Sequence, residues 1–143
     1  MSKIREREVS RMDIIGQNGN DGLHYGKLSG KGEEAIVYIE KNYPETAKEF
    51  QRIQFEQWLL FCKKQMDYGP TNISMGTPLA TDGEKRLSLV GLIVRINDKV
   101  QRLLNLMVKN NREAQNEPSI DAFKDLACYG IIAQIVQNGK WGK

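Results

Sequence analysis

Hydrophobic residues recur at helical spacing in four stretches of the chain, and alternation with the period of a β-strand is nearly absent. The pattern predicts helices over residues 33–43, 45–66, 83–110 and 119–137, of which the third has the longest regular apolar repeat. Gly69 and Pro70 end the second helix, and Pro118 suits the first turn of the fourth. We therefore predict an all-α fold, an antiparallel helix bundle with short connections.

The apolar faces of the last three helices predict the core. The residues expected at their crossing are Trp58, Leu59, Ile96, Leu103, Leu126 and Ile132. The second and fourth helices carry apolar residues on a further side as well, namely Phe55, Phe61, Ile131 and Ile135. Because a second subunit usually covers such faces, we expect a homodimer or higher homo-oligomer.

The first 32 residues differ from the rest. Residues 1–12 form a charged arm, and residues 16–32 hold six glycines together with Asn, Asp and Ser, which is loop composition. The segment matches neither the GxGxxG nor the GxxxxGK[ST] phosphate-binding motif. A flexible or edge loop is the first interpretation, and backbone amides that cover a ligand are the alternative. We divide the chain into an N-terminal arm and Gly-rich irregular segment, residues 1–32, and a helical domain, residues 33–143.

Composition narrows the possible partners. Apolar residues make up 40% and charged residues 27% of 143 residues, an ordinary globular balance for one domain. The net charge is only +3 and charges of both signs are interleaved, so we expect no binding to duplex nucleic acid. No secretory signal or spanning segment is apparent, so we expect a cytoplasmic protein without a membrane partner. Cys62 and Cys128 lie in apolar helical stretches and are expected to be reduced core thiols.

Charged residues interrupt the apolar pattern of the third predicted helix at regular spacing. They occupy positions i, i+3, i+4 and i+7 and so share one stripe: Arg95, Asp98, Lys99 and Arg102. A solvated face with weak intrahelical salt bridges is one interpretation. The alternative is a phosphate site, since arginine binds phosphate oxygens in a bidentate manner.

The fourth helix carries a carboxylate stripe. Asp121, Asp125 and Tyr129 recur at i, i+4 and i+8, and Glu117 lies one turn earlier. Like charges at i and i+4 destabilise a helix, so the two aspartates require a cation or a basic partner. Carboxylates on facing helices are typical ligands of Mg²⁺.

The end of the second helix and the residues just after it combine a cation, a carboxylate, an aromatic ring and an amide: Lys64, Asp67, Tyr68 and Asn72. These groups either complement the helix dipole or form the mouth of a site where a base stacks and is read by hydrogen bonds.

Three ordered motifs together carry a resemblance. They are Lys64-x-x-Asp67-Tyr68-Gly69, then Arg95-x-x-Asp98-Lys99-x-x-Arg102-Leu103, then Glu117-x-Ser119-x-Asp121-x-x-x-Asp125-Leu126-Ala127-x-Tyr129. Over about residues 55–137 the chain resembles the nucleotide modification associated domain of bacteriophage and prophage proteins. That family is similar in turn to the MazG-like all-α nucleotide pyrophosphohydrolases.

The resemblance implies a MazG-like bundle in the host cytoplasm that binds nucleoside phosphates, with Mg²⁺-dependent cleavage of a phosphoanhydride. It implies metal ligands at Asp98, Glu117, Asp121 and Asp125, and catalytic roles for Asp98, Asp121 and Asp125. It implies phosphate contacts from Lys64, Arg95, Lys99 and Arg102, and further nucleotide contacts from Asp67, Tyr68, Asn72 and Tyr129.

One departure from the hydrolase pattern keeps a second function open. Those hydrolases carry an ExxE helix before an ExxD helix, whereas Glu49 and Glu56 in the second helix here are seven residues apart. The leading hypothesis is a metal-dependent nucleoside polyphosphate pyrophosphohydrolase or nucleotide-modification protein. The alternative is a non-catalytic protein that sequesters a nucleotide or cyclic-nucleotide signal, and a third is a purely structural helical oligomer.

Overall fold

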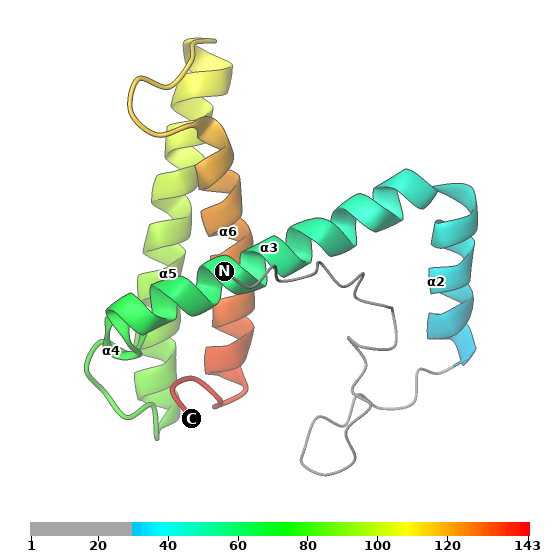
Figure 1. Cartoon of the computed structure of the whole chain (residues 1–143). Helices are drawn as coiled ribbons and strands as arrows, with labels where there is room; N and C mark the ends of the chain where they lie inside the picture. Colours follow the sequence, from blue (N-terminus) through cyan, green and yellow to red (C-terminus); the bar gives the residue numbers. More distant parts are fainter. Residues whose placement is uncertain (1–29) are drawn as a thin grey trace, which may run out of the picture. The chain divides into compact units, whose positions relative to one another are not determined.

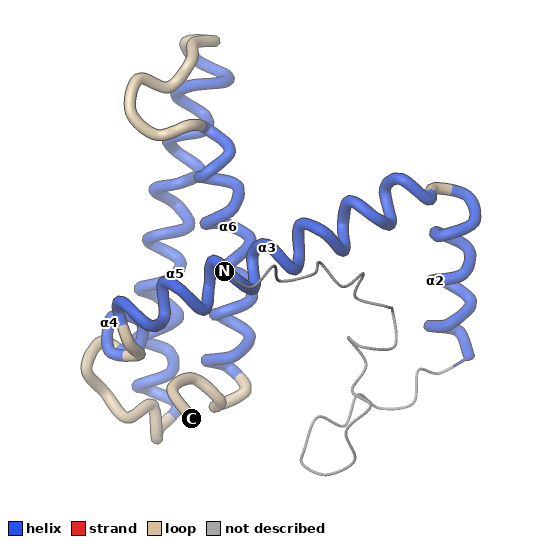
Figure 2. The backbone as a smooth tube through the Cα atoms, in the orientation of Figure 1, coloured by secondary structure: helices blue, strands red, loops and turns tan. Residues whose placement is uncertain are grey.

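The computed structural model describes residues 30–143, and every regular element in that range is a helix (Figure 1; Figure 2). The helices are α2 (Gly30–Asn42), α3 (Pro44–Tyr68), α4 (Thr71–Ser74), α5 (Asp82–Leu103), the π-helix η1 (Leu104–Lys109) and α6 (Ser119–Gln137). The predicted all-α class is confirmed for this part of the chain. The charged arm and most of the Gly-rich segment lie outside the described residues, while residues 30–32 of that segment are helical.

Contacts divide the chain into two compact units, with the boundary inside α3 between Glu49 and Phe50. The described part of the first unit consists of α2 and the start of α3, and α2 contains no buried residue. The second unit, Phe50–Lys143, contains all the buried residues of the described chain. No helix among residues 30–143 has both the length and the apolar character needed to cross a membrane.

The second unit is built on α5 and α6, which lie side by side and run in opposite directions (Figure 1). The stretch predicted as one helix over residues 83–110 is α5 continued directly by η1, in which the hydrogen-bonding pattern widens. The fourth predicted helix coincides with α6, and Pro118 directly precedes its first turn. The connection between them carries no regular element, as predicted.

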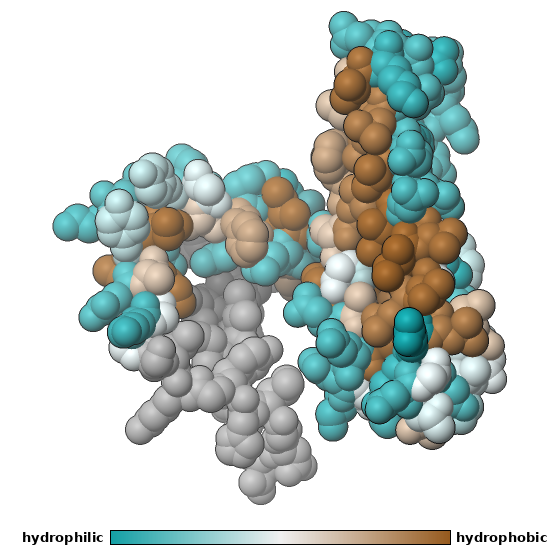
Figure 3. Space-filling view, turned by 180° about the vertical axis from the view of Figure 1, so that it is seen from behind, coloured by the Kyte–Doolittle hydropathy of each residue, from teal (hydrophilic) through white to brown (hydrophobic). Residues whose placement is uncertain are grey.

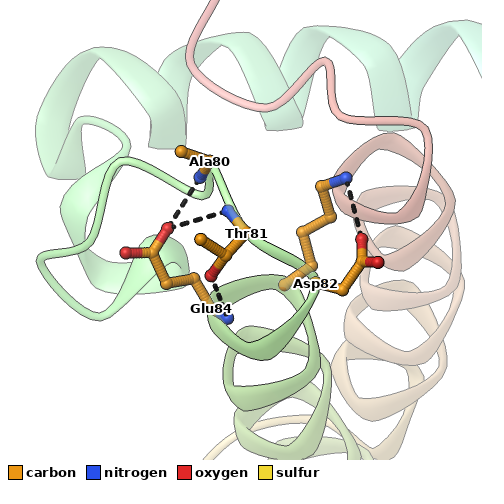
Figure 4. Close-up of polar contacts among 5 residues, drawn as sticks. Ala80, Thr81, Asp82 and Glu84 are labelled. Carbon is orange, nitrogen blue, oxygen red and sulfur yellow. Dashed lines mark hydrogen bonds and ion pairs between the residues drawn. The ribbon is translucent and has the colours of Figure 1, made fainter.

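The start of α5 is held by a capping box (Figure 4). The Thr81 hydroxyl accepts a hydrogen bond from the Glu84 backbone N–H at 3.2 Å, and the Glu84 carboxylate accepts from the N–H groups of Thr81 and Ala80 at 3.1 and 2.7 Å. Backbone donors that have no partner within the helix are thereby satisfied. Lys85 also forms an ion pair with Asp82 at 3.5 Å.

The core lies at one end of the α5–α6 pair, where α4 and the C-terminal residues pack onto it. Its buried members are Ile73, Leu79, Leu92, Ile132, Val136 and Trp141. Two hydrogen bonds fix the irregular segments to this core: the buried Ser88 hydroxyl donates to the Ile73 carbonyl at 2.6 Å, and Trp141 Nε1 donates to the Pro70 carbonyl at 2.9 Å.

The predicted core is only partly correct. Ile132 is buried, while Ile96, Leu103 and Leu126 are half-buried. The prediction is wrong for Trp58 and Leu59, whose exposed fractions are 58% and 44%. The reason is geometric: Phe61, one turn further along α3, packs against the core, and the Trp58 ring stacks on Phe61 from outside at a centroid distance of 5.7 Å.

Candidate functional site

One carboxylate connects three helices of the second unit. The Asp125 carboxylate on α6 forms two ion pairs, with Lys64 Nζ of α3 at 3.0 Å and with Lys99 Nζ of α5 at 2.8 Å. Each ammonium contacts a different oxygen, Oδ1 for Lys64 and Oδ2 for Lys99. The carboxylate is 17% exposed, whereas Lys64 is 51% exposed and Lys99 is 25% exposed. Asp125 is therefore the enclosed member of the cluster, and the lysines form its outer side.

The cluster shifts the pKa of each of its members toward the charged form. Partial burial raises the pKa of Asp125, but the hydrogen bonds from Lys99 and Lys64 outweigh burial and hold this pKa below its usual value. The hydrogen bond to Asp125 raises the pKa of Lys99. Partial burial lowers the pKa of Lys64, but the bond to Asp125 overcomes this and the net shift is upward. All three groups are charged at neutral pH.

A pocket of about 390 Å³ opens beside the cluster. Polar groups on its wall come from Lys64, Gln65, Asn72, Arg95 and Asp125, and the remainder of the wall is aromatic, aliphatic or thiol: Phe61, Tyr68, Ile73, Cys128, Tyr129, Ile132 and Trp141. A pocket with a largely apolar wall and a few converging polar groups is the usual form of a small-molecule site.

Arg95 of α5 lines the same pocket and is hydrogen-bonded to α4. Its Nη2 donates a hydrogen bond to the Asn72 backbone carbonyl at 3.0 Å, and this bond holds the guanidinium in place. The bond uses one of the five N–H donors of the guanidinium. The side-chain Oδ1 of Asn72 is buried and has no hydrogen-bond partner among residues 30–143. Arg95 therefore adds a second positive charge to the pocket wall that already carries Lys64.

The structure brings together six of the residues predicted from the sequence to form the site. Those that line the pocket are Lys64, Tyr68, Asn72, Arg95, Asp125 and Tyr129. Lys99 belongs to the same cluster through its ion pair with Asp125. The repulsion expected between Asp121 and Asp125 is relieved by lysines, since Asp125 pairs with Lys64 and Lys99, and Asp121 pairs with Lys124 at 3.5 Å.

The other predicted residues do not line this pocket. Asp67, Asp98 and Glu117 are exposed, and an Arg102 guanidinium nitrogen donates to the Glu117 backbone carbonyl. A second nitrogen of Arg102, Nη1, is buried and has no hydrogen-bond partner in the described part of the chain. The described residues contain no group of three or more acidic, histidine or cysteine side chains placed to hold a metal ion. Both oxygens of Asp125, one of the ligands expected for Mg²⁺, face ammonium groups.

Sequence reasoning missed much of the apolar wall of the pocket. Phe61 and Trp141 meet edge to face there, with ring centroids 6.1 Å apart and planes at 71°. Trp141 follows α6 in the C-terminal segment, and no periodic signal connects that segment with α3. Burial raises the pKa of the Cys128 thiol, so this group is neutral in the wall of the pocket. Both cysteines are free, as predicted, but both are half-buried and neither belongs to the buried core.

Comparison of the chain with models of protein families, with curated proteins and with solved structures found no match.

Proposed function

We propose that the second unit, Phe50–Lys143, binds the phosphate group of a nucleotide, with the phosphate beside Lys64 and Arg95 and the base among the aromatic side chains of the pocket. The observation that carries the proposal is the sharing of one carboxylate by two lysines at the edge of a pocket with an aromatic wall. Binding without turnover is the form of the function that this arrangement supports best.

The charge balance favours an anionic ligand. Lys64, Lys99 and Arg95 supply three positive charges, and Asp125 supplies one negative charge within ion-pair distance of the two lysines. The cluster therefore keeps an excess of positive charge after its internal ion pairs are counted. Lys64 is half exposed and keeps two further ammonium protons to donate, so a phosphate oxygen can bind without breaking its bond to Asp125.

The aromatic side chains favour a ligand with a planar group. Tyr68 is 65% exposed and Tyr129 is half-buried on the same pocket wall. A base can stack on such rings, and base–aromatic stacking contributes about 1–3 kcal/mol per base. The pocket volume of about 390 Å³ lies within the range of ordinary small-molecule sites.

The ion pairs of Asp125 support binding over metal-dependent hydrolysis. A carboxylate that holds Mg²⁺ must turn its oxygens to the ion, whereas both oxygens of Asp125 are engaged by Lys64 and Lys99. Recruiting it to a metal would leave two ammonium groups without their carboxylate. The sequestering function needs no rearrangement of these ion pairs. The pyrophosphohydrolase function would require Asp125 to turn from Lys64 and Lys99 to the metal ion.

The proposal is tested by thermal stabilisation of the full chain with nucleoside mono-, di- and triphosphates, each with and without Mg²⁺. A ligand that binds the native state alone raises the unfolding temperature as its concentration rises above its dissociation constant. Lys64→Met should weaken binding about tenfold, because it removes a charge-assisted hydrogen bond. Lys63→Met is the matched control, since Lys63 is the neighbouring exposed lysine on α3 and does not line the pocket.

Stabilisation by nucleotides without Mg²⁺, lost in Lys64→Met and kept in Lys63→Met, would support the binding function. No stabilisation by any nucleotide, or equal losses in the two variants, would refute it. Release of pyrophosphate from a triphosphate only in the presence of Mg²⁺ would show that the pyrophosphohydrolase hypothesis is the correct one.

A further inference from the structure

A second cavity, of about 410 Å³, is formed by α4, the residue that follows it and the middle of α5. We call it the α4–α5 cavity. On the face shown in Figure 3, apolar side chains cover much of the α5–α6 pair. The α4–α5 cavity shares Asn72, Ile73 and Arg95 with the pocket described above, whereas Lys64 and Asp125 do not line it. Most of its wall is aliphatic: Ile73, Met75, Leu87, Val90, Leu92 and Val94.

Gly91 hollows the face of α5 that lines the α4–α5 cavity. Its neighbours on the helix surface, three and four positions away in both directions, all belong to the wall: Leu87, Ser88, Val94 and Arg95. Gly91 stands at their centre without a side chain to fill the space between them. A glycine inside a helix is less favourable than an alanine, so this hollow has a cost in stability.

Met75 lies over the hollow through an unusual backbone conformation. It follows α4 with φ 53° and ψ 36°, the left-handed region that residues other than glycine rarely adopt. Its Sδ lies 3.3 Å from the position that a Cβ on Gly91 would take. The side chain is 53% exposed and is of the long, unbranched type that adapts to varied apolar partners. Met75 is therefore a movable cover, held in place by a strained backbone of the kind that gathers at ligand sites.

The polar groups of the wall favour an anionic head group. Arg95 is the one charged side chain in the wall, as far as residues 30–143 form it. The Ser88 hydroxyl donates its proton to the Ile73 carbonyl at 2.6 Å. Arg95 has five N–H donors, and its guanidinium can bind a carboxylate through two of them. An aliphatic wall with one cation is complementary to an aliphatic chain with one carboxylate.

The length of the wall sets the length of the chain. From Leu87 to Arg95 the wall follows α5 for about 12 Å, at about 1.5 Å per residue. An extended chain of about ten carbons is similar in length, since its zigzag advances slightly less than each carbon–carbon bond of about 1.5 Å. We propose that the α4–α5 cavity binds a medium-chain fatty carboxylate, with the carboxylate on Arg95 and the chain along Gly91 beneath Met75.

Isothermal calorimetry with the full chain tests the proposal, with decanoate kept below the concentration at which it forms micelles. 1-Decanol has the same chain without the charge, and decylammonium reverses the charge. Decanoate should bind saturably and about tenfold more tightly than 1-decanol, because the carboxylate gains a charge-assisted hydrogen bond. Decylammonium should bind most weakly of the three, because its charge repels that of Arg95.

Two variants with matched controls locate the site. Gly91→Leu fills the hollow and should weaken decanoate binding about tenfold or more, while the mobile Met75 side chain gives way and the fold is kept. Gly130→Leu is the control, since a Cβ there would meet nothing within 4 Å beyond its own helix among the described residues. Val94→Asp sets a like charge against the carboxylate, and its control is Ile93→Asp. Val94 and Ile93 are 55% and 62% exposed, but only Val94 lines the cavity.

Saturable decanoate binding that Gly91→Leu and Val94→Asp lose, and that both controls keep, is the expected result. Absence of saturable binding would overturn the proposal, as would equal binding of decanoate and decylammonium or equal losses in a variant and its control. If Gly91→Leu does not fold, Val94→Asp decides, because it changes an exposed position.

Lys64→Met separates this proposal from the nucleotide function, since Lys64 does not line the α4–α5 cavity. The variant should lose nucleotide affinity and keep decanoate affinity. Decanoate binding by a chain that no nucleotide stabilises would refute the nucleotide function alone. Nucleotide binding by a chain that takes up no decanoate would refute the fatty carboxylate site alone.

Discussion

Replacing Asp125 with Asn keeps the shape of the side chain and removes the charge that two lysines share. The ion pair with Lys99 is the less exposed of the two. It contributes about 1 kcal/mol to stability, the upper end of the range for ion pairs near the surface. The pair with Lys64 is half exposed and is discounted for solvent screening to about 0.5 kcal/mol. Asp125→Asn should therefore lower the free energy of unfolding by about 1 to 2 kcal/mol at neutral pH.

Urea unfolding followed by tryptophan fluorescence measures this change, since both Trp58 and the buried Trp141 lie in the second unit. Asp98→Asn is the control, because Asp98 is exposed and forms no ion pair with the described residues. A loss below about 0.5 kcal/mol in Asp125→Asn, or an equal loss in Asp98→Asn, would refute the assignment of Asp125 as the charge that joins the three helices.

The same variant separates the two functions. If the pocket binds phosphate directly, Asp125→Asn removes a competing negative charge, and nucleotide affinity should stay within a few-fold of wild type or rise. If Asp125 were a metal ligand, Mg²⁺-dependent binding and turnover would both be lost. Isothermal calorimetry with and without Mg²⁺ distinguishes these outcomes, and a variant that loses affinity in the absence of metal contradicts the phosphate arrangement proposed above.

The contribution of the cluster to stability should depend on pH in a defined way. The pKa of Asp125 is lowered in the folded state, so its contribution is present above about pH 4 and is lost as the pH falls through that lowered pKa. The pKa values of Lys64 and Lys99 are raised, so their contribution is present below about pH 10 and is lost as the pH rises through the raised values. The difference in unfolding free energy between wild type and Asp125→Asn should be constant from about pH 5 to 9 and shrink outside that window.

Three further changes test the fold by the same urea assay. Leu92→Ala should cost about 2 to 5 kcal/mol because Leu92 is 2% exposed, whereas Leu87→Ala should cost far less because Leu87 is 48% exposed; equal losses would mean that the buried face of α5 is assigned wrongly. Thr81→Ala should cost about 0.5 to 2 kcal/mol through loss of the cap of α5, and an unchanged midpoint would show that the cap does not form. Trp141→Phe should cost about 0.5 to 1.5 kcal/mol, because it removes the hydrogen bond from Trp141 Nε1 to the Pro70 carbonyl; a neutral result would place the C-terminal segment elsewhere.

The sequence by itself determined the helices and the faces on which their polar residues lie. The apolar period over residues 83–110 and 119–137 depends only on local spacing, and α5 with η1, and α6, follow it within a residue or two. The spacing of Arg95 and Lys99 placed them on one side of α5, and that of Asp125 and Tyr129 placed them on one side of α6, for the same reason.

Only the tertiary structure decided which of these faces meet. Asp125 and Lys64 are 61 positions apart, and their contact depends on where α3 crosses α6, which no local pattern encodes. The same crossing leaves Trp58 exposed and sets Phe61 against the core, although both belong to apolar runs of one helix. Lys64 and Lys99 reach Asp125 from two other helices, so a carboxylate that the sequence made a candidate metal ligand is the shared partner of two cations in the fold.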